Sequence, residues 1–376
     1  MKMDKLKNVI TLTMGQSPSS ESYNEIGEGL PFFQGKADFG KITPTVRMYC
    51  SQPSKIAIKN DILMSVRAPV GDVNISNVEC CIGRGLASLR ANEQVLYYKY
   101  LYYVLNFKKE QIANMGTGST FKAINKGILE EVEIPVPNLE EQNQIVDVLD
   151  KAQELIDKRK EQIQECDELI KSQFIEMFGD STINPNGYEV KRIDEIAELI
   201  KGITYSPEQV ASEGMIVLRS SNIKGSDFDL QDLVKITKKI NESKWVKEND
   251  ILMCNRNGSA KLVGKVAKIP KLDEAMTFGT FMTIVRSNYY EYLFAFFHTE
   301  AFRRQIQFQT AVAINQISLP LLASVNVPLP PIELQNQFAK FVQQVDKLKF
   351  EMQQSLVELE NNFNSLMQRA FKGELF

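Results

Sequence analysis

An internal repeat limits what this chain can fold into more than any other feature of its sequence. The stretch "EIPVPNLEEQNQIVDVL" begins at Glu133, and "NVPLPPIELQNQFAKFV" begins at Asn326. Both contain a Pro-x-Pro step, an acidic turn and a Gln-Asn-Gln segment that reads as the start of a helix. Such self-similarity at long separation predicts two copies of one structural unit.

The repeat extends along the whole chain, because four further pairs of segments occur in the same order. They are "EGLPFFQG" (28–35) with "EGMIVLRS" (213–220), "KNDILMSVR" (59–67) with "ENDILMCNR" (248–256), "IGRGLASLRAN" (82–92) with "FGTFMTIVRSN" (278–288), and "TFKAIN" (120–125) with "AVAIN" (311–315). The offset between partners drifts from 185 to 196 residues, as expected when loops have changed length. We therefore expect two units, near residues 1–180 and 181–376.

Each unit is expected to hold a mixed α/β head followed by a long helix, which makes the fold class α+β. "DILMSV" and "DILMCN" predict short buried strands, and "EVEIPVP" and "SVNVPLP" predict closing strands that end at proline. Residues 95–112 and 291–306 predict helices whose aromatic residues are spaced as in a core, although aromatic rings also stack on bases. The expected boundaries are a first head at 1–137, a first helix at 138–180, a second head at 181–330 and a second helix at 331–376.

Both long helices carry a heptad pattern of apolar residues, which predicts that each packs against a partner helix. In the first helix the pattern consists of Leu149, Ala152, Ile156, Ile163, Cys166 and Ile170. In the second helix it consists of Val345, Leu348, Met352, Leu356, Leu359, Phe363, Leu366 and Ala370, with an irregular 4-4 step at Met352. Each helix should be about 60 Å long at ~1.5 Å per residue. The pattern favours an antiparallel coiled coil with pseudo-two-fold symmetry inside one chain, and it leaves open a pairing with another molecule.

The repeated junction motif fits the start of such a helix. Proline ends the head, and Glu140 and Glu141 fall in the first helical turn, where the helix dipole favours negative charge. Gln142 and Gln144 are expected to be polar residues flanking the first apolar position.

The residue types exclude most catalytic chemistry. The single histidine, His298, lies in an aromatic run and is expected to be packed or at the surface rather than catalytic. The five cysteines form no CxxC pair, which indicates a reducing cytoplasm and no zinc site. Phosphate-binding GxxxxGK[ST] and GxGxxG motifs are missing, and no apolar stretch is long enough to cross a membrane. These absences argue for a binding or scaffold protein without its own cofactor.

The charge is distributed unevenly along the chain. The whole sequence has a net charge of −3, yet residues 132–180 alone contain 5 Lys and Arg against 13 Asp and Glu. Acidity is therefore concentrated in the first long helix, and the heads are the parts suited to an anionic partner.

The chain resembles the specificity subunit of type I restriction–modification systems. The resemblance rests on the duplicated head-plus-helix plan, on "GTGSTFKAINKGILEEVEIPVPNLEEQ" (116–142), on "FIEMFGD" (174–180) and on "LMQRAFKGELF" (366–376). It implies two target-recognition domains that each read half of an asymmetric, two-part double-stranded DNA site. It also implies that the helices set the spacing and bind two methyltransferase subunits, which carry S-adenosylmethionine, and that the complex can recruit restriction subunits. The specificity subunit itself catalyses nothing.

The candidate DNA contacts follow from this resemblance, because lysine and arginine bind phosphates and specific side chains read base edges. Arg67 and Arg256 occupy the same position in the two copies, where arginine contacts guanine or pairs with a nearby carboxylate. Arg84 lies between two glycines that also suit a tight turn. The remaining candidates lie on loops of the two heads: Ser119, Thr120, Lys122, Arg219, Asn222, Lys224, Asn257, Ser259 and Lys261. The loop at 116–120 either cradles a phosphate with backbone N–H groups or is a plain turn.

Two other functions remain open from the sequence. A stand-alone DNA-binding regulator with two heads would bind its target without a methyltransferase. A coiled-coil adaptor would not bind nucleic acid at all.

Overall fold

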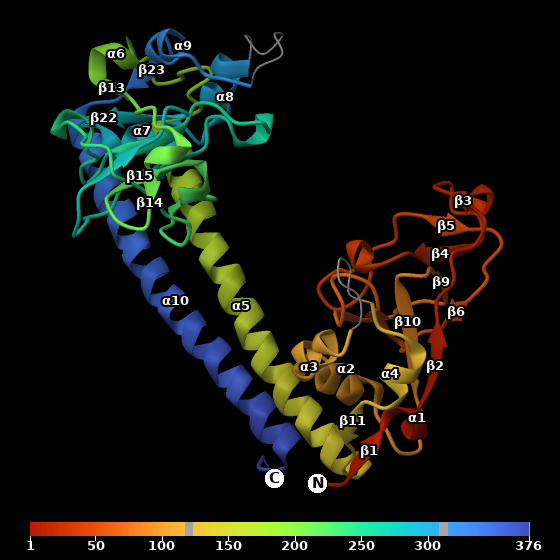
Figure 1. Ribbon diagram of the computed structural model, residues 1–376. Helices are drawn as coiled ribbons and strands as arrows, with labels where there is room; N and C mark the ends of the chain where they lie inside the picture. Colours follow the sequence, from red (N-terminus) through yellow and green to blue (C-terminus); the bar gives the residue numbers. More distant parts are fainter. Residues whose placement is uncertain (117–122, 308–314, 376) are drawn as a thin grey trace. The chain divides into compact units, whose positions relative to one another are not determined.

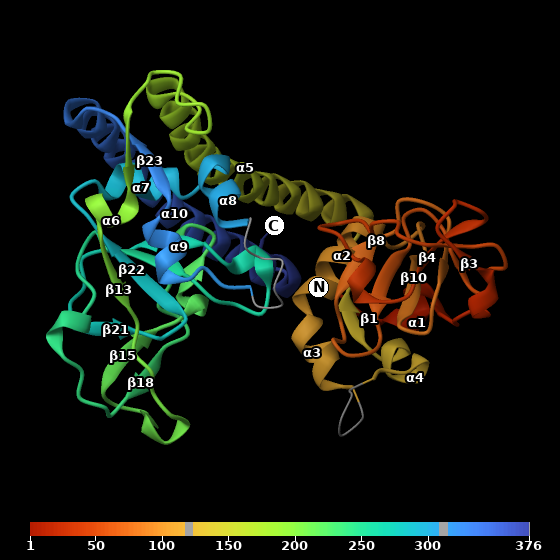
Figure 2. The same cartoon turned by 90° about the horizontal axis from the view of Figure 1, so that it is seen from above.

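The computed structural model describes residues 1–116, 123–307 and 315–375. The chain forms two units, which Figures 1 and 2 show from two directions. The first unit contains Met1–Lys160 and Gln354–Phe376, and the second contains Glu161–Gln353. Each unit therefore holds one head together with parts of both long helices.

The first head is built on an antiparallel sheet of four strands. Its order is β2 (Ile10–Met14), β10 (Leu86–Ala91), β7 (Ile62–Ser65) and β8 (Val73–Ile75). Strand β7 is buried on both faces. Ile62 and Met64 face the core shared with the helices, and Leu63 faces a second cluster that includes Phe33. The apolar run in the sequence reflects this two-sided burial, and the prediction of a buried strand is confirmed.

A second sheet completes the first head. Its order is β3 (Tyr23–Asn24), β5 (Tyr49–Cys50), β4 (Leu30–Phe33), β9 (Cys80–Ile82) and β6 (Ile56–Ala57), with β4 and β9 parallel. The remaining elements are β1 (Met3–Lys5), α1 (Leu6–Val9), α2 (Tyr98–Phe107), α3 (Lys109–Asn114), α4 (Lys126–Glu130) and β11 (Glu133–Pro135), with β1 pairing with β11. Figure 1 shows α2 beside the N-terminal part of α5 (Leu139–Phe178), and Lys99 of α2 forms an ion pair with Asp150 of α5 at 2.7 Å.

The second head repeats this plan. Its four-stranded antiparallel sheet has the order β13 (Glu198–Lys201), β22 (Met282–Arg286), β19 (Ile251–Cys254) and β20 (Val266–Lys268). Its second sheet has the order β14 (Val210–Ala211), β18 (Val234–Ile236), β15 (Met215–Leu218) and β21 (Met276–Phe278). β15 and β21 are parallel, as β4 and β9 are in the first head. The other elements are β12 (Glu189–Arg192), α6 (Ile193–Ile196), β16 (Ile223–Lys224), β17 (Asp227–Phe228), α7 (Tyr290–Phe296), α8 (Glu300–Gln307), α9 (Leu319–Ala323) and β23 (Asn326–Leu329).

The predicted helical runs in the heads are present, but each is divided into two short helices, α2 with α3 and α7 with α8. Their aromatic residues form core, as their spacing favours. Tyr100, Tyr292 and Phe296 are fully or almost fully buried.

The repeated junction motif forms buried hydrogen bonds where each head meets its long helix. The Tyr100 hydroxyl donates to the Pro135 carbonyl at 3.0 Å, and the Tyr292 hydroxyl donates to the Pro328 carbonyl in the second unit. Gln142 is fully buried, and its Nε2 donates to the carbonyls of Val95 and Pro137 at 2.8 Å.

Gln142, expected as a polar residue flanking the first apolar position, is therefore a buried and hydrogen-bonded part of the junction. Its equivalent Gln335 donates to the Pro330 carbonyl at 2.7 Å. The buried Pro-x-Pro carbonyls need donors, because an unpaired buried carbonyl is costly. The glutamine that is repeated in the two copies supplies such a donor.

The two long helices, α5 and α10 (Ile332–Lys372), run in opposite directions where they meet. In the first unit, Lys160 of α5 forms an ion pair with Glu360 of α10 at 2.8 Å. In the second unit, the ring centroids of Phe174 and Phe338 lie 5.6 Å apart. Residues from the late part of α5 thus meet residues from the early part of α10.

The predicted apolar pattern on α10 needs one correction. Leu348 is 45% exposed, whereas the next residue, Lys349, is only 8% exposed. With Lys349 in place of Leu348, the helix-facing positions follow regular steps of four and three through Met352 and Leu356. The irregular step expected from the sequence is therefore absent, because the buried residue at this point of the pattern is Lys349 and not the apolar Leu348.

Candidate nucleic-acid interface

Two equivalent arginine loops leave the central sheets of the two heads. Arg67 follows β7 and Arg256 follows β19, and both side chains are exposed. Each residue forms an isolated antiparallel bridge to a later segment, Arg67 to Ala123 and Arg256 to Gln316. Neither arginine forms an ion pair with any carboxylate in the described parts of the chain. Both guanidinium groups can therefore present their N–H donors outward.

These bridges also correct the alignment of the repeat. The Ile124 N–H donates to the Val66 carbonyl at 3.0 Å, and the Ile317 N–H donates to the Asn255 carbonyl at 2.8 Å. Ile124 is thus equivalent to Ile317, so "KAIN" matches "NQIS" (315–318) and not "AVAIN". The offset between these two segments is then 193 residues, the same as that of the junction motif. The similarity of "TFKAIN" to "AVAIN" therefore does not reflect structural equivalence.

A second pair of equivalent positions lies where β4 and β15 end. Arg219 follows β15, and its Nη2 lies 2.8 Å from Asp232 Oδ2. Gln34 occupies the same place after β4 and is exposed. Sequence reasoning proposed Arg219 and missed Gln34, although the pairing of "EGLPFFQG" with "EGMIVLRS" already placed them opposite each other.

Asn222 does not belong to the interface. It is fully buried, its Oδ1 accepts from the Arg219 N–H at 2.8 Å, and its Nδ2 donates to the carbonyls of Asp229 and Asp232. The amide is fully engaged inside the head, so it cannot read adenine as expected. It caps the turn after β15, as the carboxylate of Asp38 accepts from the Gln34 N–H after β4.

Lys224 is exposed and already has partners. Its Nζ lies 2.6 Å from Asp229 Oδ2 and 2.9 Å from Gln231 Oε1. The hydrogen bond from Lys224 lowers the pKa of Asp229. Exposed ion pairs of this kind contribute little to stability, so a phosphate can compete with Asp229 for the lysine.

The loop after Arg256 is organised by its own polar residues. Asn257 donates from Nδ2 to Ser220 Oγ at 3.2 Å and accepts from the Ser259 N–H at 3.0 Å. Ser259 and Lys261 are exposed beside it. In the first head, Arg84 is also exposed, and its N–H donates to Ser17 Oγ at 3.3 Å.

The candidates Ser119, Thr120 and Lys122 lie outside the described residues. Their assignment to the interface stays a prediction.

A polar hollow in the first head was missed by the sequence analysis. It has a volume of about 640 Å³, and its lining includes Gln34, Lys36, Arg47 and Pro69. Lys36 is tied to Asp72 at 2.9 Å, and Arg47 is tied to Asp38. Because Pro69 is two residues from Arg67, the hollow extends the surface around that arginine. No periodic pattern in the sequence indicates this hollow, since its residues come from four separate stretches of the chain.

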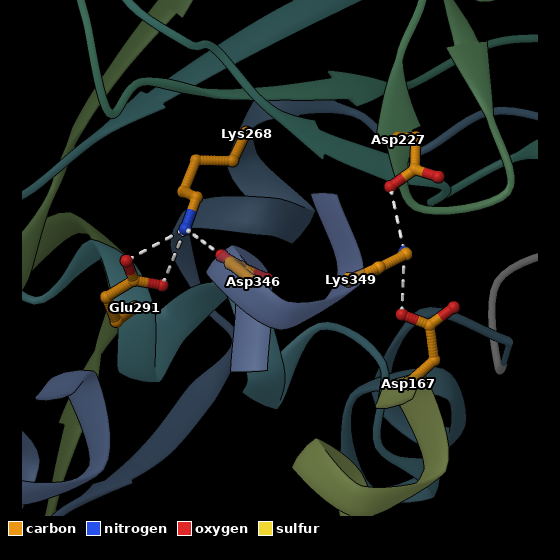
Figure 3. A network of polar contacts seen from close by, with 6 residues as sticks. All are labelled: Asp167, Asp227, Lys268, Glu291, Asp346 and Lys349. Carbon is orange, nitrogen blue, oxygen red and sulfur yellow. Dashed lines mark hydrogen bonds and ion pairs between the residues drawn. The ribbon is translucent and has the colours of Figure 1, made fainter. Parts of the chain in front are cut away.

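The second head is fastened to its helices by two ion-pair clusters (Figure 3). Lys268 contacts Glu291 at 2.8 Å and Asp346 of α10 at 3.3 Å. Lys349 of α10 contacts Asp167 of α5 at 2.8 Å and Asp227 of the head at 3.1 Å. These contacts fix the head of the second unit on the helix residues of that same unit.

Other polar groups in the described residues serve the core. His298 shares a hydrogen bond with Ser226 Oγ at 3.0 Å and one with the Phe294 carbonyl at 2.8 Å, and burial lowers its pKa. It is packed, as expected. Across the described ranges, no group of three or more His, Cys, Asp or Glu side chains could hold a metal ion. In the same residues, no helix combines the length and the apolar character needed to span a bilayer.

Taken together, the duplicated scaffold and its loops define a class of two-headed binding proteins whose heads share a fold and differ in exposed side chains. The family model described as "Type I restriction modification DNA specificity domain" matches residues 1–165 and 185–361. The chain therefore belongs to the family of type I restriction–modification specificity subunits.

Known relatives agree with this assignment. The type I restriction enzyme MjaIX specificity subunit of Methanocaldococcus jannaschii is 24% identical, covering 99% of this chain and 92% of that protein. The EcoKI specificity subunit of Escherichia coli is 28% identical over 51% of this chain and 44% of its own length. Another relative, assigned to the MjaX system of M. jannaschii, is 48% identical over 158 residues, which is 41% of this chain and 37% of that protein.

A solved structure supports the fold. The specificity subunit of a type I system from M. genitalium superposes with a TM-score of 0.53 at 18% identity, covering 98% of this chain and 96% of that one.

Proposed function

We propose that this chain reads DNA for a type I restriction–modification complex, with each head reading one half of an asymmetric two-part site. The observation that carries the proposal is the pair of equivalent, exposed strand-exit arginines, Arg67 and Arg256, in unlike surroundings. Arg67 lies between Val66, which donates to the Gly85 carbonyl, and Ala68, which lines the polar hollow, whereas Arg256 lies over the ring of Phe281. Equivalent scaffolds with different side chains suit two different half-sites.

The exposed side chains supply the chemistry that such a site needs. An arginine can bind the O6 and N7 atoms of guanine through two hydrogen bonds, which discriminates against other bases by about 1–3 kcal/mol. In this proposal, the exposed residues Lys224, Lys261 and Arg84 bind phosphates, which position the protein without reading sequence. Asn257 and Ser259 remain candidates for base or backbone contacts next to Arg256.

The partners follow from the family. In this proposal the chain itself catalyses nothing, two methyltransferase subunits bind along the helices and carry S-adenosylmethionine, and restriction subunits join the same complex. In this proposal, exposed apolar residues of α5 and α10 are the candidate contacts for these partners. They include Leu155, Leu169, Ile175 and Val357, each about half exposed. Native mass spectrometry of the co-expressed complex counts the methyltransferase subunits.

The test replaces the two arginines in the co-expressed methyltransferase complex. Arg67→Ala should relax recognition at one base pair of one half-site, and Arg256→Ala should relax one base pair of the other. The expected loss is about 1–3 kcal/mol of discrimination at that position. Methylome sequencing reads out both half-sites at once. Arg192→Ala is the matched control, because Arg192 is an exposed arginine paired with Asp194 away from these loops.

The outcomes separate the possible functions. If both variants methylate the original motif unchanged, the two arginines do not read bases. Tight sequence-specific binding by the chain alone, with no effect of a methyltransferase, would instead indicate a stand-alone regulator. Absence of any DNA binding in the complex would indicate an adaptor.

A further inference from the structure

We propose that Phe281 is a positioning residue for specificity in the second head, and that it holds the guanidinium of Arg256 in the orientation that reads a base. This inference rests on the proposed function and adds a residue to it. Neither the sequence motifs nor the comparisons point to Phe281, which lies in the short turn between β21 and β22.

The contacts join Phe281 to the arginine loop twice. The Arg256 guanidinium carbon lies 5.0 Å from the centre of the Phe281 ring. The Phe281 carbonyl accepts from the Asn255 N–H at 2.9 Å and from the Arg256 N–H at 3.3 Å. The backbone bonds fix the distance between the two loops, so the ring lies under the guanidinium as a consequence of the fold.

The exposure of Phe281 fits a surface role. Its side chain is 50% exposed, unlike the neighbouring Phe278, which is fully buried. A ring stacked on the flat face of a guanidinium leaves the N–H groups at its edge free. Since guanine is read through those edge donors, stacking and base reading are compatible. No described carboxylate competes for them.

The first head lacks this support. Gly85 is equivalent to Phe281, because its carbonyl accepts from the Val66 N–H at 2.9 Å as that of Phe281 accepts from Asn255. A Cβ atom at Gly85 would lie 2.3 Å from the Gln34 carbonyl oxygen, so no side chain fits there. Arg67 has no cation–π contact with a ring of the described residues, whereas Arg256 has one with Phe281. Arg67 is therefore less restrained, and the two heads should differ in how stringently their arginines select a base.

The experiment uses the complete methyltransferase complex and a panel of DNA duplexes with each base at every position of the second head's half-site. Phe281→Leu keeps an apolar side chain but removes the ring, and Phe281→Tyr keeps the ring. We expect Phe281→Leu to lose about 3- to 10-fold of discrimination at the position relaxed by Arg256→Ala, as loss of a cation–π contact would produce. Phe281→Tyr should keep it. The other half-site should be unaffected in both variants.

A double substitution tests whether Phe281 acts through Arg256. Phe281→Leu combined with Arg256→Ala should discriminate no worse than Arg256→Ala alone, because residues that act together are not additive. Unchanged discrimination in Phe281→Leu, relaxation at a different position, or an additive double variant would each overturn the positioning role. A ring that wedges between bases would give the last two results.

The proposed function can fail separately. If Arg256→Ala leaves discrimination unchanged while the complex still methylates its motif, the positioning role is overturned and DNA reading by the heads stands. If the unmodified complex shows no sequence dependence in either half-site, the proposed function itself is wrong.

Discussion

At the scale of single residues, each head has one ion pair between a buried aspartate and an arginine, and this pair organises the turn before the central strand. Asp61 is 1% exposed, and its carboxylate accepts from Arg90 Nε at 2.8 Å. In the second head, Asp250 is 2% exposed and accepts from Arg286 Nε at 2.8 Å. Each aspartate follows an asparagine with positive φ, a conformation that asparagine tolerates better than most residues. The repeated "ND" before "ILM" therefore reflects a turn and a buried aspartate that is paired with an arginine.

Asp250→Ala should lower the free energy of unfolding of the second unit by about 1.5–3 kcal/mol, because it removes charged hydrogen bonds from a buried site. The single tryptophan, Trp245, lies in this unit, and its carbonyl accepts from Arg286 Nη2 at 3.1 Å. Tryptophan fluorescence during urea unfolding should therefore show a lower midpoint. Asp61→Ala is the matched control, since it removes the same pair from the first unit and should move the tryptophan signal less. Equal shifts of the tryptophan unfolding midpoint in the two variants would contradict the expectation that each ion pair stabilises its own unit.

The residues also show where sequence reasoning succeeded and where it could not. Repeated letters located the central strands, the helices and both strand-exit arginines, because apolar runs and repeat order depend on local sequence. Repeated letters did not reveal that the polar side chains of Asn222 and Gln142 are buried. Each side-chain amide donates a hydrogen bond to a backbone carbonyl of another segment. Burial of a polar group depends on a partner supplied by the fold. Phe281 was missed for the same reason, since its contact with Arg256 joins loops distant in sequence.

At the scale of secondary-structure elements, helix α10 contains a buried lysine among the apolar residues that face α5. Lys349 lies between Val345 and Met352 on the face turned towards α5, where its Nζ meets Asp167 and Asp227. Burial by itself would lower the pKa of Lys349, but the hydrogen bonds and charges of both aspartates outweigh it, so the pKa is raised. A single polar residue in such a position can fix the alignment of two helices.

Lys349→Met should therefore change the pH dependence of the free energy of unfolding more than it changes the free energy of unfolding at pH 7. Because the pKa of Lys349 is higher in the folded state than in the unfolded state, its stabilising contribution is complete below the unfolded value of about 10.4. This contribution to stability is lost as the pH rises through the pKa that Lys349 has in the folded state. At pH 7 the variant should stay within about 1 kcal/mol of the original, since apolar residues often replace buried charges without loss.

The measurement is urea unfolding followed by Trp245 fluorescence at pH 7 and in the range above about pH 10. The original chain should lose more stability over this range than Lys349→Met does. Lys347→Met is the control, because Lys347 is exposed on the same helix and should leave the alkaline loss unchanged. The same alkaline loss in Lys349→Met and in the original chain would mean that Lys349 does not stabilise the helix contact through its charge.

At the scale of the whole molecule, the repeat makes two heads and two helices of nearly equal length. Helix α5 has 40 residues and α10 has 41, so each is about 60 Å long at ~1.5 Å per residue. Each unit contains an antiparallel meeting of the two helices, through Lys160 and Glu360 in one and through Phe174 and Phe338 in the other. If the helices set the distance between the heads, their length determines the unread base pairs between the half-sites.

Inserting one heptad into both helices tests this spacing role, with insertions after residues 160 and 353, where the two units divide. A heptad keeps the apolar positions in phase and lengthens each helix by about 10 Å, which corresponds to roughly three base pairs. The expected result is a longer unread spacer with both half-sites unchanged, read by methylome sequencing of the complex. Three base pairs also rotate one half-site by roughly a third of a turn, so overall methylation should fall. The spacer among sites that remain methylated is the decisive quantity.

A heptad inserted into α5 alone is the control, because it changes the length of one helix and shifts its contacts with the other. That variant should lose methylation without producing a defined new spacer. An active double-insertion variant that keeps the original spacer would show that the helices do not set the distance. The heads would then reach their half-sites through the surrounding subunits, and the equal lengths of α5 and α10 would serve the binding of two equivalent partners instead.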